Sequence, residues 1–214
     1  MLAAMPTHKM EIPLNPTIDY YFAVQSPWTY LGHARFSAIA KAAGAKVNVR
    51  PVDYGQIFPI SGGLPLPKRA PQRQAYRLVE LARFRDALNL PMYIQPKFFP
   101  VAGDDSARLI TAVELHDGAD AALKMSSAVF GAVWEQELDI ANPDTLILLL
   151  QQCGLNADRL ALSRGTPVQQ KYEANTQAAI AANVFGAPSY VVDGEIFWGQ
   201  DRLEFLQKRL MQTL

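Results

Sequence analysis

The stretch that decides the fold is residues 18–31, which reads IDYYFAVQSPWTYL. Residues 18–24 are rich in aromatic and β-branched side chains, and this composition predicts a strand buried on both faces. A helical pattern opens at Trp28 and runs to residue 43, where Gly44 suits its end. The predicted strand turns directly into this helix. Ser26 therefore lies at a helix start, where unpaired backbone N–H groups stabilise an anion.

A second strand is predicted at residues 46–52, where polar and apolar residues alternate and Pro51 ends or edges the run. Residues 18–52 then form a βαβ unit, and its two strands are expected to be parallel.

The end of the chain returns to strand texture. Residues 188–192 and 195–198 are predicted strands, and Asp193-Gly194 between them is a two-residue hairpin signal. Asp201 is expected to cap a last helix over residues 203–211.

The middle of the chain reads differently. Residues 59–71 are a Gly- and Pro-rich connection, and helical patterns dominate after it. In residues 72–88 the side chains of Arg77, Glu80 and Arg83 have spacings that predict exposed ion pairs. Further helix starts are expected at Asp104 or Asp105, Ala119, Asn142-Pro143 and Thr166-Pro167. We therefore predict a discontinuous α/β domain with an inserted all-helical domain.

Composition limits the classes of function. The chain has 214 residues, 50% hydrophobic, with net charge zero, so nucleic acid is not an expected partner. Cys153 is the one cysteine, which excludes an intramolecular disulfide, suits the cytoplasm and predicts a buried structural thiol. Residues 1–16 are expected to be a flexible N-terminal tail rather than a signal peptide, and no apolar stretch approaches the roughly 20 residues of a membrane span. His8, His33 and His116 are scattered, so no metal site is predicted.

Three separated motifs then fit one family. They are YYF at residues 20–22 leading to SPWTYL at 26–31, VFGAP at 184–188, and FWGQDR at 197–202. With these motifs the chain resembles the glutathione-dependent branch of the DsbA-like thioredoxin superfamily, closest to the 2-hydroxychromene-2-carboxylate isomerases and the kappa-class glutathione transferases. The resemblance extends over nearly all residues from 18 to 210. It implies a thioredoxin-like domain of residues 17–60 plus 184–214 and a helical insertion of residues 61–183.

The resemblance also implies a site for glutathione. Relatives with a redox function carry Cys-x-x-Cys at the helix start, whereas Ser26 and Thr29 stand there in this chain. Ser26 is the implied catalytic residue, because the family serine hydrogen-bonds the glutathione sulfur. Pro188 matches the family's cis-proline, whose isomer frees the backbone of Ala187 to pair with a peptide ligand, although only about 5–6% of X-Pro bonds are cis.

Further glutathione contacts are implied around that site. Asp201, with Gln200, matches the position that holds the γ-glutamyl end of glutathione. The same set includes Val184, Trp198 and Gly199.

The resemblance implies a small aromatic carboxylate as substrate. Arg73 takes the place of a family lysine, and a cation there could meet either the glycyl carboxylate of glutathione or the substrate carboxylate. Lys68 and Arg69 are nearby alternatives to it. Gly63 replaces a family asparagine, so one side-chain contact is missing. The walls of an aromatic pocket could come from Trp28, Phe98, Phe99 and Trp198, of which at least half are expected to be core residues only.

The function implied is glutathione-dependent cis-trans isomerisation of 2-hydroxychromene-2-carboxylate and trans-o-hydroxybenzylidenepyruvate, intermediates of aromatic degradation, by a cytoplasmic homodimer. One alternative is a kappa-like transferase that conjugates electrophiles, because the same site serves both reactions. Another is a non-catalytic glutathione-binding protein, which the Gly63 replacement keeps open. A disulfide oxidoreductase is disfavoured, because no cysteine lies near residues 26–29.

Overall fold

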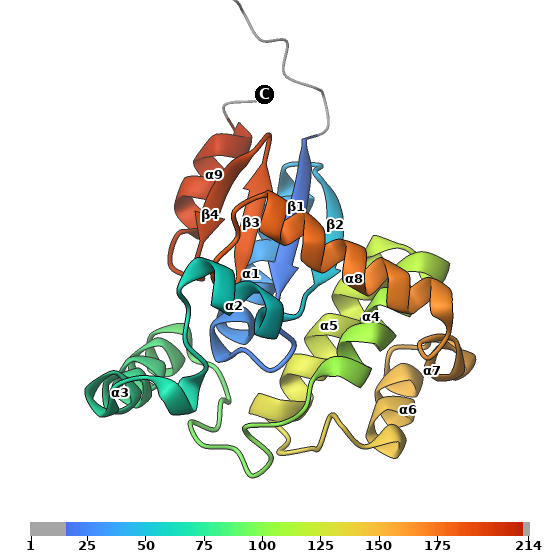
Figure 1. Cartoon of the computed structure of the whole chain (residues 1–214), viewed down its shortest axis with the longest axis horizontal. Helices are drawn as coiled ribbons and strands as arrows, with labels where there is room; N and C mark the ends of the chain where they lie inside the picture. Colours follow the sequence, from blue (N-terminus) through green and yellow to red (C-terminus); the bar gives the residue numbers. More distant parts are fainter. Residues whose placement is uncertain (1–15, 212–214) are drawn as a thin grey trace, which may run out of the picture.

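The computed structural model describes residues 16–211, and its centre is a four-stranded sheet in the order β2-β1-β3-β4 (Figure 1). The strands are β1 (Thr17–Phe22), β2 (Lys46–Pro51), β3 (Ser189–Val192) and β4 (Glu195–Trp198). β1 and β2 are parallel, whereas β3 pairs antiparallel with both β1 and β4. The predicted βαβ start and hairpin finish are confirmed. Most of the predicted tail and His8 lie outside the described residues.

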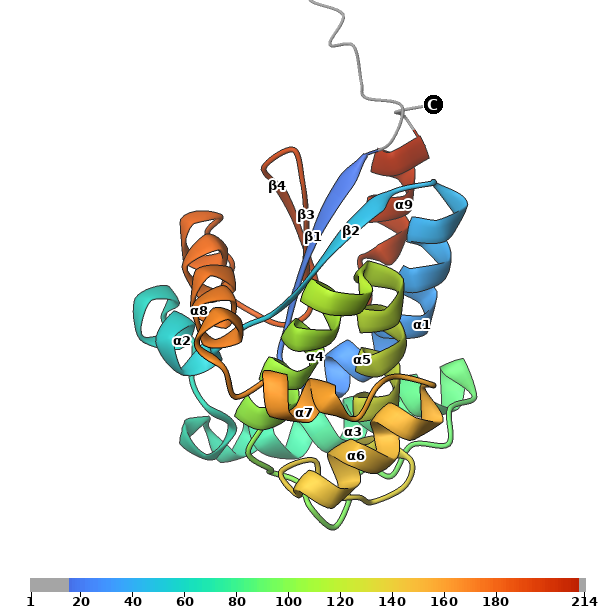
Figure 2. The same cartoon turned by 90° about the vertical axis from the view of Figure 1, so that its right-hand side faces the viewer.

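Helix α1 (Pro27–Ala42) makes the crossover from β1 to β2. It begins where predicted because Ser26 is its N-cap, with Oγ accepting a hydrogen bond from the Thr29 amide at 3.3 Å, and Pro27 occupies the first helical position. Figure 2 shows α1 and α9 (Leu203–Met211) on one side of the sheet, and α2 (Tyr54–Ser61) and α8 (Thr166–Ala181) on the other.

The remaining helices come from the middle of the chain. They are η1 (Leu66–Lys68), α3 (Pro71–Leu88), α4 (Asp104–Asp117), α5 (Ala119–Trp134), α6 (Pro143–Gln152) and α7 (Asp158–Leu162). Helices α4 and α5 contact β2, and α5 also contacts α1. One buried cluster therefore joins Phe22 and Phe36 to Phe130 and Trp134. The division into residues 17–60 plus 184–214 and residues 61–183 stays a prediction.

Several local expectations were wrong. Residues 54–61 form α2 although Pro59 lies inside it, because Asp53 caps its start through the Gly55 amide at 2.7 Å and the helix ends soon afterwards. Gly103 precedes α4, so neither Asp104 nor Asp105 is its cap. Helix α9 begins at Leu203, and the Leu206 amide bonds to the Arg202 carbonyl; Asp201 is one residue too early to be the cap.

Arg77 is the largest departure. The spacing predicted an exposed ion pair, but Arg77 is only 9% exposed and its guanidinium lies 5.1 Å from the centroid of the Phe99 ring. The reason is the orientation of α3. Arg77 shares a helix face with Leu81 and Phe84, and this face turns toward the core.

Cys153 is buried at the end of α6, as predicted, and burial raises the pKa of its thiol. No helix within the described residues is long and apolar enough to cross a membrane.

His33 is a buried link between three elements. It lies on α1 and is 4% exposed; Nε2 is 3.0 Å from the Leu123 carbonyl of α5, and Nδ1 is 3.2 Å from the Tyr20 hydroxyl of β1. A carbonyl only accepts, so Nε2–H donates to Leu123 and Nδ1 accepts from Tyr20. Burial lowers the pKa of His33 from 6.5 to about 4, which keeps the ring neutral.

His33 should make stability depend on pH. Above pH 6.5 the ring is neutral in both the folded and unfolded states, so its full contribution is present. As the pH falls toward 4 the unfolded chain binds a proton that the folded protein does not, and about 2 kcal/mol is lost between pH 7 and pH 5. Denaturant unfolding of the protein and of His33→Gln should show their gap in unfolding free energy narrowing by that amount. A gap that is constant with pH contradicts the prediction.

Candidate functional site

Ser26 lies in the turn between β1 and α1, half-buried, with its amide bonded to the Ala23 carbonyl at 3.1 Å. Its Oγ accepts from Thr29, so the hydroxyl proton remains available to a ligand. The amide of Trp28 belongs to the first turn of α1, where helix N–H groups lack intrahelical partners. The sequence thus builds a small set of donors at the positive end of a helix.

The loop before β3 lies beside this turn. The Ala187–Pro188 bond is cis, which confirms the prediction. Ser189, the first residue of β3, pairs with Tyr21 near the C-terminal end of β1. The residues just before Ser189 therefore lie at the end of β1 from which the chain continues to Ser26. The Gly186 carbonyl accepts from Tyr54 Oη at 2.8 Å and from Ser189 Oγ at 2.7 Å, which fixes the loop. Within residues 16–211 the backbone of Ala187 has no backbone hydrogen-bond partner.

The turn after β4 is tied to the same loop, because the Gly199 amide donates to the Pro188 carbonyl at 2.9 Å. Gly199 has φ of 100°, and a Cβ there would lie 2.6 Å from Asp201 Oδ1. Asp201 is exposed and forms an ion pair with Arg202. A side chain at Gly199 would therefore displace the carboxylate that lies over the turn.

Gln200 points the other way. It is 2% exposed, and Arg35 of α1 donates to its side-chain Oε1 and, at 3.0 Å, to its carbonyl. The structure thus directs Asp201 outward and Gln200 toward α1.

Two further residues of the predicted glutathione site lie around the loop. Trp198 is 43% exposed and packs on Phe185 with ring centroids 4.9 Å apart. Val184 is buried and lines a groove of about 280 Å³ between α2 and the end of α8. The loop at residues 184–188 and the turn at residues 198–201 are therefore in contact. Ser26 does not line this groove.

The predicted substrate residues lie in or near helices: Lys68 in η1, Arg73 in α3, Trp28 in α1 and Phe99 in the segment between α3 and α4. Lys68 and Arg73 are exposed. Trp28 is half-buried against Phe84 at 6.1 Å, and Phe99 is half-buried against Trp134 at 4.9 Å.

Two more of the predicted substrate-side positions have local partners. Phe98 is half-buried under Lys97. At Gly63 an added Cβ would lie 2.3 Å from the Phe58 ring, so the place of the family asparagine side chain is filled by Phe58.

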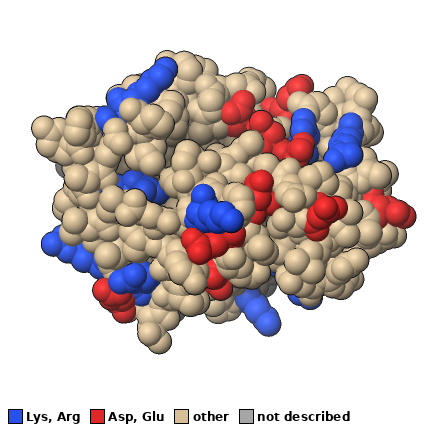
Figure 3. Space-filling model, turned by 90° about the horizontal axis from the view of Figure 1, so that it is seen from below, with Lys and Arg blue, Asp and Glu red and all other residues tan. Residues whose placement is uncertain are grey.

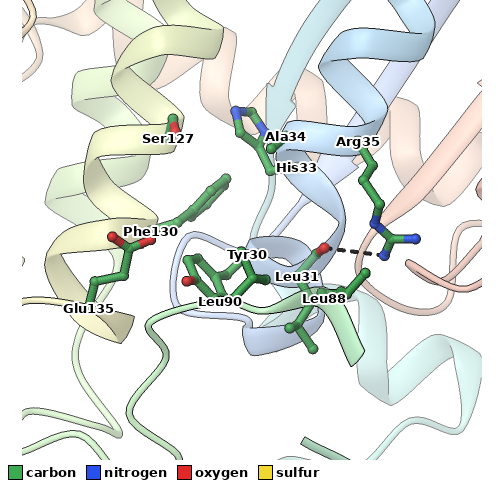
Figure 4. A pocket seen from close by; sticks show the side chains of 10 residues that line it. All are labelled: Tyr30, Leu31, His33, Ala34, Arg35, Leu88, Leu90, Ser127, Phe130 and Glu135. Carbon is green, nitrogen blue, oxygen red and sulfur yellow. Dashed lines mark hydrogen bonds between the residues drawn. The ribbon is translucent and has the colours of Figure 1, made fainter. Parts of the chain in front are cut away.

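A cavity of about 210 Å³ opens on another side of α1 (Figure 4). Its lining comes from α1, from α5 and from the chain around the end of α3, and it comprises Tyr30, Leu31, His33, Ala34, Arg35, Leu88, Leu90, Ser127, Phe130 and Glu135. Burial and the Glu135 carboxylate raise the pKa of Tyr30. Ser26 is not part of the lining, and sequence motifs did not reveal this cavity because its walls are far apart in the chain.

Charge is mixed on the face seen from below in Figure 3, where Lys and Arg side chains are interspersed with Asp and Glu. Sequence reasoning missed Tyr54, which holds the Gly186 carbonyl beside the cis-proline. Tyr54 gave no signal because α2 itself was not predicted.

The fold combines a β2-β1-β3-β4 sheet with a seryl hydroxyl at the start of its first helix and a cis-proline directly before β3. The DSBA-like thioredoxin domain matches residues 17–211, and the chain belongs to this family. It is similar to 2-hydroxychromene-2-carboxylate isomerase of Sphingobium xenophagum, with 28% identity over 200 residues, 92% of this chain and 100% of that protein. The resemblance that the three motifs predicted is thus confirmed.

Two other similarities are informative. Human Glutathione S-transferase kappa 1 is 29% identical over 206 residues, which cover 91% of this chain and 90% of that protein. A solved structure of 2-hydroxychromene-2-carboxylate isomerase aligns with a TM-score of 0.77 at 24% identity, over 92% of this chain and 95% of that one. This structural likeness shows the shared fold.

Proposed function

We propose that this protein is a glutathione-dependent cis-trans isomerase of 2-hydroxychromene-2-carboxylate-type compounds and their ring-opened benzylidenepyruvates. The observation that carries the proposal is Ser26, a hydroxyl donor at the start of α1 beside the cis-proline loop. A protein thiol is missing there: the one cysteine of the chain, Cys153, is buried at the end of α6. Because disulfide exchange by the protein needs a reactive thiolate of its own, this site does not support that reaction. Any thiol that reacts beside Ser26 has to come from a small molecule.

The residues present fit glutathione. The unpaired backbone of Ala187 can form strand-like hydrogen bonds with the peptide part of the ligand. The outward carboxylate of Asp201 can accept from the γ-glutamyl ammonium group. Ser26 Oγ–H and the first amides of α1 supply the donors that a thiolate needs.

Glutathione, when bound, supplies a thiolate that adds reversibly to a conjugated double bond, so that the bond can rotate before elimination restores it. The protein's own part is to hold the charge and the geometry. Ser26 donates toward the sulfur, which favours the ionised form at neutral pH. Trp28 of α1 and Phe99, in the segment between α3 and α4, present apolar rings on which a flat aromatic compound can bind with little water.

The experiment is an isomerisation assay with purified protein and 2-hydroxychromene-2-carboxylate, with and without added glutathione. We expect turnover that saturates with glutathione and leaves glutathione unconsumed. Turnover that is equally fast after complete removal of glutathione would refute the mechanism.

A kappa-type transferase is the second candidate, and its support is the similarity to human Glutathione S-transferase kappa 1. It predicts a stable glutathione adduct with a model electrophile such as 1-chloro-2,4-dinitrobenzene. Mass spectrometry of the products separates the two reactions, because an isomerase yields no adduct at the end of turnover.

A further inference from the structure

Arg77 is a buried cation that no group within residues 16–211 neutralises. Its side chain is 9% exposed, and its Nη2 is buried without a hydrogen-bond partner. Within residues 16–211 it has no ion pair and no hydrogen bond. Its guanidinium makes a cation–π contact with the face of the Phe99 ring, at 5.1 Å from the ring centroid. Burial of an unpaired guanidinium costs free energy, so this side chain indicates a binding site in which a bound anion neutralises the charge.

The surroundings of Arg77 add positive charge. Arg73 lies one turn before it on α3, and Arg69 lies two residues before this helix begins. Arg69 uses its Nε for the Leu64 carbonyl at 2.8 Å, and none of the three forms an ion pair within the described residues. Burial first and Arg69 second lower the pKa of Arg77 to about 10, so at neutral pH it keeps its charge. Like charges at this spacing destabilise a helix, which a bound anion would offset.

Two contacts place Arg77 on the side of the molecule where α1 begins. Phe84 lies on the same face of α3, two turns or about 10 Å along the axis, and packs on Trp28, two residues after Ser26. Phe99, beneath the guanidinium, belongs to the segment that leads to Gly103. At Gly103 an added Cβ would lie 2.6 Å from Val24 and 2.7 Å from Gln25, directly before Ser26.

We propose that Arg77 is the specificity-determining residue that binds the carboxylate of an aromatic substrate, with Phe99 holding the guanidinium in place. This inference rests on the proposed function and extends it to a residue outside the three family motifs. The exposed Lys68 and Arg73 attract the anion from solvent, whereas the guanidinium on its aromatic support provides the fixed, two-pronged contact that a carboxylate matches.

The test is a binding cycle that does not depend on turnover. Titration calorimetry measures trans-2-hydroxycinnamate, a carboxylate probe, and its neutral carboxamide against the protein and against Arg77→Met. We expect the variant to bind the carboxylate roughly 10- to 100-fold more weakly, the range of a charge-assisted hydrogen-bonded pair, and the carboxamide within about twofold. Arg77→Lys should be intermediate for the carboxylate. Arg83→Met, which removes an exposed arginine of the same helix, is the matched control and should change carboxylate affinity less than about threefold.

Three outcomes overturn the proposal: equal losses for carboxylate and carboxamide, no binding of the carboxylate by the parent protein, or a loss confined to glutathione affinity. The last would assign Arg77 to the glycyl carboxylate instead. Failure of the proposed function is a different result, in which the cycle behaves as expected but no chromene is isomerised.

Thermal unfolding without ligand separates binding from a structural role. Because Arg77 has no ion pair and no hydrogen bond within residues 16–211, Arg77→Met should melt at the same temperature as the parent protein or higher. A drop in melting temperature together with equal loss of both probes would show that Arg77 only supports the fold.

Discussion

Ser26→Ala should lower kcat of glutathione-dependent isomerisation roughly 100- to 1000-fold, the effect of removing one donor to a developing anion. The physical reason is the position of the hydroxyl. Its oxygen already accepts from the Thr29 amide at 3.3 Å, so its proton is directed to whatever lies at the start of α1. Without it, the thiol of bound glutathione should ionise at a higher pH. Ultraviolet absorbance of the thiolate during a pH titration measures that change directly.

Two controls separate this effect from damage to the helix. Loss of an N-cap costs about 1 kcal/mol, so Ser26→Ala should melt somewhat lower and still be folded at assay temperature. Ser127→Ala on α5 removes an exposed hydroxyl and should leave kcat and the thiol titration unchanged. An unaltered kcat in Ser26→Ala would sink the proposed mechanism, whatever the melting temperature.

Sequence patterns predicted those parts of the site whose structure depends on one short segment of the chain. β1 and Ser26 each depend on a few adjacent residues whose roles follow from strand and cap chemistry, whereas the cis bond before Pro188 was implied by the family resemblance of residues 184–188. The hairpin at Asp193-Gly194 is of the same kind, since both residues have positive φ, 50° and 82°. These features needed no knowledge of the packing of distant elements.

Features set by packing between distant segments were missed. Charge spacing along α3 is the same whether Arg77 faces solvent or Phe99, because the loop that carries Phe99 decides which side is covered. The role of Gln200 at the ligand stays a prediction, and no local pattern indicated that its side chain accepts from Arg35, 165 positions earlier in the chain. The motif gives residue identities, and only the packing of α1 against the turn determines the direction of each side chain.

Gly32 is where that packing is closest, and Gly32→Val should destabilise the protein by about 3 kcal/mol. An added Cβ at Gly32 would lie 2.9 Å from Gln200 Cβ, 3.1 Å from Tyr190 Oη and 3.3 Å from Gln200 Cα. Intrinsic helix propensity argues the other way, since glycine inside a helix is about 1 kcal/mol worse than alanine. Denaturant unfolding of Gly32→Ala and Gly32→Val decides between the two, because steric overlap predicts a loss that grows with side-chain size.

Gly131→Ala is the matched control. Gly131 is also buried and helical, but its nearest neighbour to an added Cβ is Glu135 Cδ at an ordinary 3.7 Å, so this variant should be stabilised by about 0.5–1 kcal/mol. The two sides of the Gly32 contact carry Ser26 and Asp201, so Gly32→Val should also weaken glutathione binding roughly tenfold, as expected when two halves of a site are displaced. Unchanged glutathione affinity in a destabilised Gly32→Val would show that α1 and the turn at residues 199–201 do not act together on the ligand.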